Sequence, residues 1–387
     1  MITPCRDVRR LLLCLLLLGT ESFAATFQLP SPEGPFGLGF WESSLKTDRV
    51  DDLADQPNSK RELLLQVWYP AEKSGIPRSY AASEVINALA LQFGLPKDFG
   101  DSVVTHASPM ERAHTGAFPL VVFSHGLSWP GILYQSLVED IASRGYVVVV
   151  VTHPHGASIT RFPDGRIVDM SRWPKLKDPK QEDALLARQA ANWAADLKDV
   201  ITLCYKWNTP DTSNPVAGHL DLAHVVVMGH SLGGTAAGQA LEDSRVTAGV
   251  ALEGKARRID GDRQRVSKPF MHLIGGYNRL ELEGSQYRID DAGVLYEVIV
   301  SGATHTSFSD LIFVYKRFAD ANWLQRHRYE VEPERIIQIT RDYVAAFLDR
   351  VFFGKSSTLL QPVSYAARVD RPQTSGYPEV ELQVTVK

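Results

Sequence analysis

The sequence feature that most constrains the fold is a serine between two glycines, placed where a strand pattern gives way to a helix pattern. Gly229-His230-Ser231-Leu232-Gly233 follows the β-branched run 225–228 and precedes the small-residue stretch 234–241. A strand that turns abruptly into a helix strains the serine backbone, and the two glycines let neighbouring backbone pass closely. The pattern Gly-x-Ser-x-Gly alone would occur by chance in roughly one such chain in ten. The strand pattern before it and the helix pattern after it are what predict a nucleophile elbow, which presents Ser231 at the carboxyl edge of a sheet.

Short apolar runs recur along the chain, and amphipathic helix patterns separate them. Such runs are typical of strands covered on both faces; they lie at 62–70, 118–123, 146–151, 225–228, 246–252, 269–274 and 295–300. Helices are predicted from the cap Asp178 to Cys204, and from Pro333 to Gly354. This alternation predicts an α/β fold with a mostly parallel central sheet and helices on both faces.

The segments outside this pattern suggest how the chain is organised. We expect a signal peptide at 1–24, a mostly loop-like N-terminal extension at 25–61, the α/β domain at 62–354 and a tail at 355–387. The tail alternates apolar and polar residues from Val380 onward, which predicts an edge strand or a segment folded back on the domain. Two insertions interrupt the domain, at 78–116 and 157–180, and the apolar stretch in the first makes it a candidate lid.

The first 24 residues have the pattern of an export signal. Arg6, Arg9 and Arg10 precede the leucine-rich run 11–18, and Ser22-Phe23-Ala24 offers small residues at the two positions that a signal peptidase reads. The run is too short to span a bilayer. We expect cleavage after Ala24 and a secreted or periplasmic protein.

Cysteine content agrees with a fold that does not depend on disulfides. Cleavage after residue 24 would remove Cys5 and Cys14 and leave only Cys204, so the mature chain could form no internal disulfide bond. Cys204 lies on the apolar stripe of a predicted helix, where a packing role is expected.

Charge and motif content exclude several classes of function. The formal net charge is −4 and no basic cluster is interleaved with aromatic residues, so no nucleic-acid partner is expected. Gly-x-Gly-x-x-Gly, Cys-x-x-Cys and His-Glu-x-x-His are absent from the sequence. His153-Pro154-His155 lacks a third ligand at a convincing spacing, so lining of the site or hydrogen bonding to the loop is favoured over a metal site. We expect neither a metal nor an organic cofactor.

A serine hydroxyl becomes nucleophilic when a histidine accepts its proton, and that histidine needs a carboxylate to hold its tautomer. After an elbow the expected chain order is serine, acid, histidine. Three histidines follow Ser231, but His272 lies inside an apolar strand and His327 in a basic, helix-like segment. His305 follows the last core strand in a glycine-bearing loop, and it is therefore the predicted base.

The acid has more than one candidate. Glu253 ends the strand after the elbow and precedes Gly254, so its carboxylate should lie at the same sheet edge as Ser231. The turn after the next strand reads Gly275-Gly276-Tyr277-Asn278, without an acid. Glu253 is favoured; four alternatives remain open, namely Asp260, Asp262, Glu281 and Glu283.

Two backbone N–H groups should stabilise the oxyanion that forms when a serine attacks an ester. One belongs to the residue after the nucleophile, Leu232. The other should come from the loop after the strand 118–123, which reads Ser124-His125-Gly126-Leu127. Leu127 is the predicted second donor.

Several motifs occur together in one order: Val67-Trp68-Tyr69-Pro70, residues 122–127, residues 137–153, residues 229–234, Ala251-Leu252-Glu253, and His305 with Phe308 and Asp310. From about Leu63 to Phe353 the chain thereby resembles the platelet-activating factor acetylhydrolase family of serine esterases, which has the α/β-hydrolase fold. The resemblance implies an acid at Glu253, where the family usually has aspartate, and oxyanion donors at Leu127 and Leu232.

The resemblance also implies a class of substrate. It points to esters with short or oxidised acyl chains, including phospholipids cut at the middle glycerol position. Separately, the apolar stretch 85–95 suggests transient contact with a lipid surface, with an ordinary buried helix as the alternative. The same architecture serves general lipases and polyester-degrading enzymes. Hydrolysis of an amide, and a non-catalytic binding protein on the same fold, are the competing hypotheses.

Overall fold

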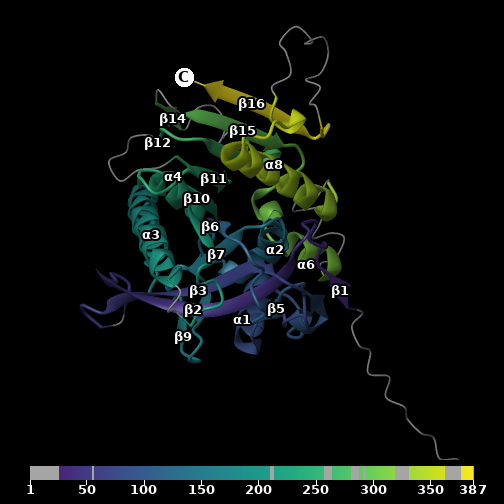
Figure 1. The fold of residues 1–387 in the computed structure, drawn as a ribbon. Coiled ribbons are helices and arrows are strands. Elements are labelled where there is room, and N and C mark those ends of the chain that lie inside the picture. Colours follow the sequence, from purple (N-terminus) through teal and green to yellow (C-terminus); the bar gives the residue numbers. More distant parts are fainter. Residues whose placement is uncertain are drawn as a thin grey trace, which may run out of the picture.

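The computed structural model describes residues 26–54, 56–209, 213–256, 264–279, 287–290, 293–318, 331–361 and 376–386. The predicted signal peptide, Cys5 and Cys14 lie outside these described residues. Within them, the main sheet has ten strands (Figure 1). Across the sheet they are β16 (Val380–Val386), β15 (Val294–Val300), β13 (Phe270–Gly275), β11 (Ala248–Leu252), β10 (Leu220–His230), β6 (Phe118–Ser124), β7 (Val147–Thr152), β3 (Lys60–Ala71), β2 (Gly37–Val50) and β5 (Ser108–Pro109).

The six strands from β15 to β7 run parallel, and antiparallel strands flank them. β16 pairs antiparallel with β15, so the tail forms the edge strand that its alternation predicts. On the other side, β3 is antiparallel to both β7 and β2. The valine-rich β7 is fully buried, as expected for a strand with helices above and below it.

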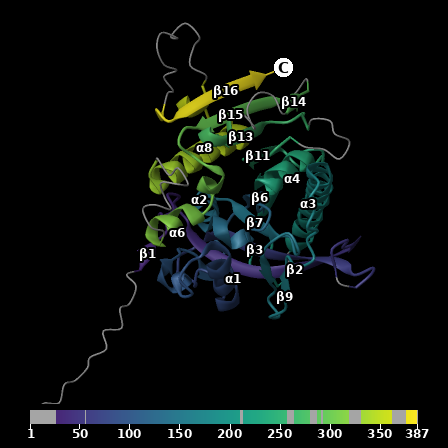
Figure 2. The same cartoon turned by 180° about the vertical axis from the view of Figure 1, so that it is seen from behind.

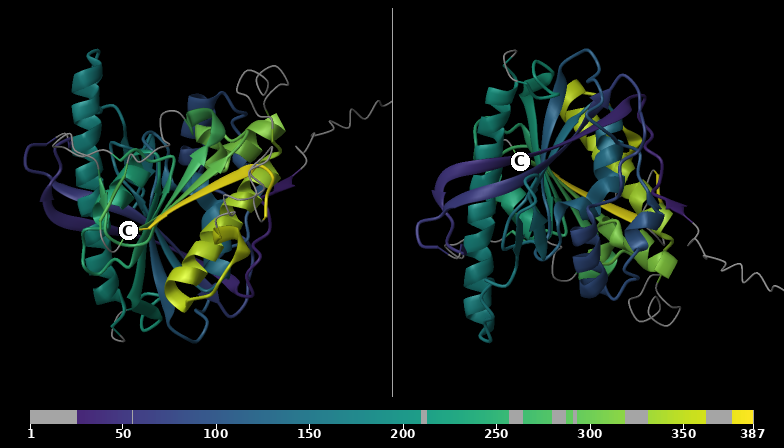
Figure 3. Two further views of the ribbon diagram at one scale, coloured as in Figure 1. Left: turned by 90° about the horizontal axis from the view of Figure 1, so that it is seen from above. Right: turned by 90° about the horizontal axis from the view of Figure 1, so that it is seen from below.

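Two layers of helices cover the sheet (Figures 2 and 3). Alternate residues of each strand point to opposite faces: in β6, Leu120 and Val122 join one apolar core, whereas Val121 and Phe123 join the other. The first core also contains residues of α3 (Pro179–Trp207) and α4 (Leu232–Ala240). The second contains residues of α2 (Gln135–Ser143), α6 (Leu311–Phe318) and α8 (Pro333–Phe353).

The long helices begin where their sequences predict; α8 also ends as predicted, whereas α3 continues past Cys204 to Trp207. Asp178 caps α3 by accepting a hydrogen bond from the Lys180 N–H at 3.0 Å, and Cys204 is buried on its inner stripe. In α8, the polar Thr340 donates its hydroxyl to the Ile336 carbonyl, which allows it to be buried. Gly354 ends α8 in the left-handed conformation. No helix in the described ranges is long and apolar enough to cross a membrane.

The segment before residue 62, which the sequence suggested was mostly loop, instead carries a long strand. β2 spans Gly37–Val50 and forms a hairpin with β3. Its second half alternates between partly buried and exposed residues and has a polar composition. A strand pairs through its backbone, and the side chains on its solvated face can be polar. The second half of β2 therefore lacks the apolar run that predicts a buried strand.

The two insertions contain secondary structure of their own. The first holds α1 (Ser83–Phe93) and β4 (Val103–Val104), which pairs with β1 (Phe27–Gln28). The second holds an antiparallel ribbon of β8 (Ile159–Arg161) and β9 (Ile167–Asp169). A further small ribbon joins β12 (Arg265–Val266) and β14 (Arg288–Ile289).

Candidate active site

Ser231 lies in the sharp turn between β10, which ends at His230, and α4, which begins at Leu232. Its backbone angles are φ 54° and ψ −119°, a conformation that L-residues rarely adopt. A Cβ at Gly229 would lie 2.3 Å from the Gly233 carbonyl oxygen, and a Cβ at Gly233 would lie 2.3 Å from that of Ser124. Only glycine fits at either position, and the predicted elbow geometry is present.

The neighbouring parallel strands end beside Ser231. Gly229 pairs with Ser124 of β6, and His230 pairs with Leu252 of β11. Three residues in the loops at this edge have positive φ without being glycine: Ser128, His155 and Glu253. Strained backbone of this kind concentrates at functional sites, where the surrounding structure holds it in place.

Glu253 and His305 lie together at this edge. The His305 Nδ1 is 3.1 Å from the Glu253 Oε2. The glutamate side chain is fully buried, whereas 44% of the histidine side chain is exposed. A histidine whose Nδ1–H donates to a buried carboxylate keeps Nε2 available to accept a proton, as a general base requires.

Two further donors hold the Glu253 carboxylate. The Gly275 N–H donates to Oε1, and the Asn278 side-chain amide donates to Oε2 at 2.5 Å. Gly275 ends β13 and Asn278 lies in the turn that follows, and the sequence showed this segment to lack an acid. This turn supports the carboxylate of the neighbouring strand instead of supplying its own.

Of the other candidates, only His272 lies within the described residues. His272 is buried within β13. His327 and the four alternative acids, Asp260, Asp262, Glu281 and Glu283, lie outside the described residues.

Leu127 and Leu232 supply backbone close to the serine. The Leu232 N–H belongs to the first turn of α4 and so has no acceptor within the helix. A Cβ at Gly126 would lie 3.3 Å from the Ser231 Cβ, so the loop before Leu127 runs against the nucleophile position. This proximity fits an oxyanion hole shared by the two loops.

A buried hydrogen-bond chain connects the oxyanion loop, the elbow and the His305 loop. The Gly126 N–H donates to the Tyr134 hydroxyl at 3.0 Å, and that hydroxyl is 2.9 Å from the His230 Nδ1. The His230 Nε2 is 2.9 Å from the His305 carbonyl oxygen, which can only accept. Nε2 therefore carries the proton, and Tyr134 donates to Nδ1. Burial lowers the pKa of His230 well below its usual value, which keeps the ring neutral.

This chain was not predicted from sequence, and it can be tested by one substitution. Tyr134→Phe leaves the His230 Nδ1 and the Gly126 N–H buried without a partner, and we expect it to lower the free energy of unfolding by about 1–3 kcal/mol. Tyr205→Phe is the control, because the Tyr205 side chain is 43% exposed. Urea denaturation measures both; equal stability of the two variants would contradict the structural role of Tyr134.

Asp310 fixes the segment that follows His305. Its buried carboxylate accepts hydrogen bonds from the N–H groups of Gln135 and Ser136 at 2.9 and 3.0 Å, at the start of α2. It also accepts the Tyr80 hydroxyl at 3.1 Å. The His305 loop is thus tied to a helix N-terminus, which favours a negative charge, and to the first insertion.

An aromatic cluster lies beside His305. Trp129 stacks on His230 with ring centroids 5.0 Å apart and lies 6.1 Å from the His305 ring. Phe93, at the end of α1, packs edge-on against both Trp129 and Tyr315. The first insertion thus contacts the site through α1; its action as a lid remains a prediction.

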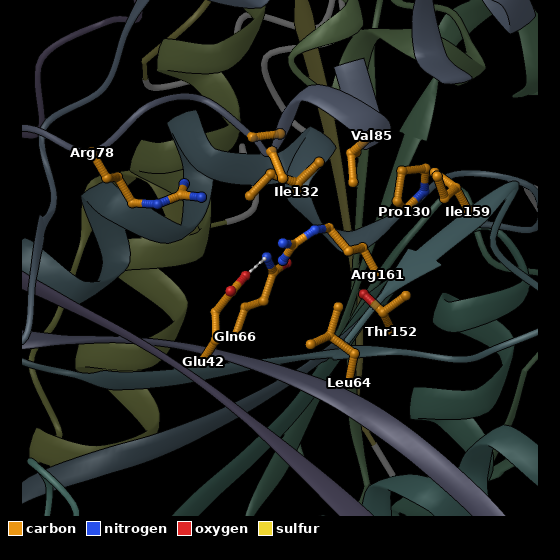
Figure 4. Close-up of a pocket in the computed structure, with 12 residues that line it drawn as sticks. Glu42, Leu64, Gln66, Arg78, Val85, Pro130, Ile132, Thr152, Ile159 and Arg161 are labelled. Atoms are coloured by element: carbon orange, nitrogen blue, oxygen red, sulfur yellow. Dashed lines mark hydrogen bonds between the residues drawn. The ribbon is translucent and has the colours of Figure 1, made fainter. Parts of the chain in front are cut away.

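A separate cavity is lined by residues of β2, β3, β8, the end of β7 and the first insertion (Figure 4). Its polar side chains include Glu42, Gln66 and Arg161, and Gln66 donates to Glu42 at 2.8 Å. Pro130 and Ile132 line it from the loop that follows Leu127. None of its lining residues belongs to the predicted catalytic set.

The buried His153 side chain hydrogen-bonds to Ser124 at the end of β6 and to Asp196 in α3, and not to the loop. Among the described residues, no group of three or more His, Cys, Asp or Glu side chains is arranged to hold a metal ion.

Comparison with known proteins adds independent evidence. Residues 53–355 match the model of the family described as platelet-activating factor acetylhydrolase, isoform II. The platelet-activating factor acetylhydrolase of Canis lupus familiaris is 28% identical over 322 residues, which cover 74% of this chain and 69% of that protein. A probable 1-alkyl-2-acetylglycerophosphocholine esterase of Arthroderma benhamiae is 24% identical over 290 residues, 68% of this chain and 65% of that protein.

A solved structure is similar over nearly the whole chain. The ferulic acid esterase from Streptomyces cinnamoneus superposes with a TM-score of 0.71 and 27% identity, covering 92% of this chain and 99% of the esterase. Together with the sheet order and the elbow, this likeness confirms the predicted α/β-hydrolase fold.

Proposed function

Because the chain belongs to the platelet-activating factor acetylhydrolase isoform II family and is a carboxylic ester hydrolase, we propose that it cleaves short-acyl esters, including phospholipid-like lipids, through Ser231, His305 and Glu253. The observation that carries this proposal is the hydrogen bond of the exposed His305 to the buried Glu253, at the sheet edge where Ser231 occupies a strained elbow. These groups supply a nucleophile, a base and an orienting carboxylate.

The proposed reaction proceeds through an acyl-enzyme. The Ser231 Oγ attacks the ester carbonyl while the His305 Nε2 accepts its proton, and Glu253 stabilises the imidazolium. The N–H groups of Leu127 and Leu232 stabilise the oxyanion. His305 then protonates the departing alcohol, and a water molecule activated by the same histidine releases the acid and restores Ser231.

Preference for a short acyl chain is supported by the crowding around His305. Trp129 lies beside His305, and Phe93 and Tyr315 extend this aromatic cluster; in the proposed function the cluster narrows the space for an extended chain. Two relatives are named for acetyl substrates, which agrees with this preference.

The same aromatic side chains favour a second candidate, an esterase for aromatic acyl groups. A planar aromatic acid could stack on Trp129, and the structurally similar ferulic acid esterase is named for such a substrate. Stacked or edge-on aromatic pairs add about 0.5–1.5 kcal/mol beyond simple burial.

Initial rates on matched esters separate these candidates. We expect kcat/KM for p-nitrophenyl acetate to exceed that for the decanoate by at least ~30-fold, about 2 kcal/mol of lost transition-state stabilisation. A 2-acetyl phospholipid should also be cleaved, releasing acetate. Constant or rising rates with long chains would indicate a lipase, and a preference for methyl ferulate over the acetyl esters would favour the second candidate.

Export and lipid contact complete the proposal. Residues 1–24 support secretion or release into the periplasm, and N-terminal sequencing of the exported protein should begin at Ala25. Three large apolar side chains are exposed in or beside the first insertion, Ile76, Leu91 and Met110, and they support transient contact with a lipid surface.

A further inference from the structure

Directly behind the oxyanion loop lies a second Ser–His–Asp arrangement that no substrate can reach. The Ser124 Oγ is 2.8 Å from the His153 Nε2, and the His153 Nδ1 is 2.7 Å from the Asp196 Oδ2. All three residues have 0% exposure. Arg61 donates to both oxygens of Asp196 at 2.7–2.9 Å, which compensates the buried charge. A sealed serine cannot be a nucleophile for external esters, so this network has another role.

The protons in this network can be assigned from its charges. Burial alone would raise the pKa of Asp196, but Arg61 and His153 hold it well below its usual range, so the group is a carboxylate. Burial lowers the pKa of His153 to about 4. Neutral His153 therefore donates its Nδ1–H to Asp196 and accepts, at Nε2, a hydrogen bond from the Ser124 hydroxyl. This fixes His153 where β7 ends.

His153 in turn fixes His125. The His153 backbone N–H donates to the His125 Nε2 at 2.9 Å, so that nitrogen is the acceptor of the ring. The proton must then sit on Nδ1, which lies 2.7 Å from the Gly126 carbonyl oxygen and donates to it. Burial lowers the pKa of His125 well below its usual value, and the ring stays neutral. The Trp193 ring, 5.0 Å away between centroids, packs against it.

The hydrogen bond to Gly126 acts on the oxyanion hole through peptide geometry. The Gly126 C=O and the Leu127 N–H belong to one planar trans peptide and point in opposite directions. A donor that fixes the carbonyl therefore fixes the direction of the N–H. It also draws electron density toward the carbonyl oxygen, which makes the N–H a stronger donor.

We propose that His125 is a positioning residue that orients the Gly126–Leu127 peptide so that the Leu127 N–H faces the oxyanion, and that the Ser124–His153–Asp196 network holds His125 in place. This inference rests on the proposed function, because it assigns a role in the same ester hydrolysis. It also explains why a buried triad-like network lies beside the active site without taking part in the bond changes.

Two substitutions at His125 separate its two hydrogen bonds. In His125→Asn the side-chain N–H₂ can take the place of Nδ1 and still donate to the Gly126 carbonyl. In His125→Gln the amide oxygen can take the place of Nε2 and still accept from His153, but the donor to Gly126 is lost. We expect His125→Asn to lower kcat for p-nitrophenyl acetate by less than ~5-fold, and His125→Gln to lower it by roughly 10²-fold with KM changed by less than ~3-fold.

An inhibition constant provides a readout that general loss of structure would not produce. A boronic acid forms a tetrahedral serine adduct with an oxygen in the oxyanion hole, so its inhibition constant should rise in His125→Gln in proportion to the loss of kcat, while KM stays constant. Equal kcat for His125→Gln and wild type, or equal losses in the Asn and Gln variants, would overturn the positioning role. A wild-type protein unable to hydrolyse esters would instead overturn the proposed function itself.

If either variant fails to fold, the wild-type protein still decides the question. In a crystal structure with the boronic acid bound, the Leu127 N should lie within hydrogen-bond distance of a boronate oxygen, with the Gly126 carbonyl still bonded to the His125 Nδ1. A peptide turned so that the Leu127 N–H points away from the boronate would overturn the proposal.

Discussion

Ser231→Ala is expected to lower kcat for p-nitrophenyl acetate by about 10⁴- to 10⁶-fold, the range in which removal of a nucleophilic serine leaves only binding and the oxyanion hole. Alanine removes the hydroxyl but retains the Cβ and the backbone strain of the elbow. Its thermal midpoint should therefore lie close to that of the wild type. Initial rates measure the loss of catalysis, and thermal unfolding shows that the fold is retained.

Ser171→Ala is the matched control, because Ser171 is exposed in the second insertion and far along the chain from the elbow. It should keep the wild-type rate. Retention of more than about one-hundredth of the wild-type rate by Ser231→Ala would mean that another group attacks the ester.

Glu253→Gln should have the second largest effect, a loss of about 10³- to 10⁴-fold in kcat near neutral pH. Three donors converge on this carboxylate, from Gly275, Asn278 and His305. A carboxylate accepts from all of them, whereas glutamine turns one oxygen into an N–H₂ group that faces a donor. His305 would lose its correct tautomer or its partner, and the developing imidazolium would lose a negative charge.

Rates measured from pH 6 to 9 test this expectation, with Glu62→Gln as the control. Glu62 forms an ion pair with Arg166 in which Arg166 is more than half exposed, and such pairs contribute little. The result that would contradict Glu253 as the acid involves the four alternative acids. Full activity in Glu253→Gln, together with its loss in Asp260→Asn, Asp262→Asn, Glu281→Gln or Glu283→Gln, would move the acid to that residue.

The central strands and the elbow were predictable because burial on both faces leaves a strong signal in the sequence. β7 is a run of valines, and its apolar character follows directly from the helices above and below it. β2 left no such signal. Its hairpin with β3 is held by backbone hydrogen bonds, and much of its second half is solvated, so polar residues are compatible with the strand.

The residues of the candidate site likewise differ in whether the sequence could predict them. Ser231, His305 and Glu253 could be singled out because chain order and strand ends limit the choice. The bonds of Tyr134 to His230, and of His153 to His125, join residues far apart in sequence, and they depend on how β6, β7 and β10 pack together. The tautomer of His125 follows from its contact with the His153 N–H, and that of His230 from its contact with the His305 carbonyl, and no local pattern marks either.

The most direct measurement is to treat the wild-type protein with a fluorophosphonate and identify the modified residue by peptide mass spectrometry. A serine activated by a histidine reacts with such a reagent, whereas an ordinary hydroxyl does not. The expected result is a single adduct on Ser231 and complete loss of ester hydrolysis. An adduct on another residue, or full modification of Ser231 without loss of activity, would contradict the assignment of Ser231 as the nucleophile.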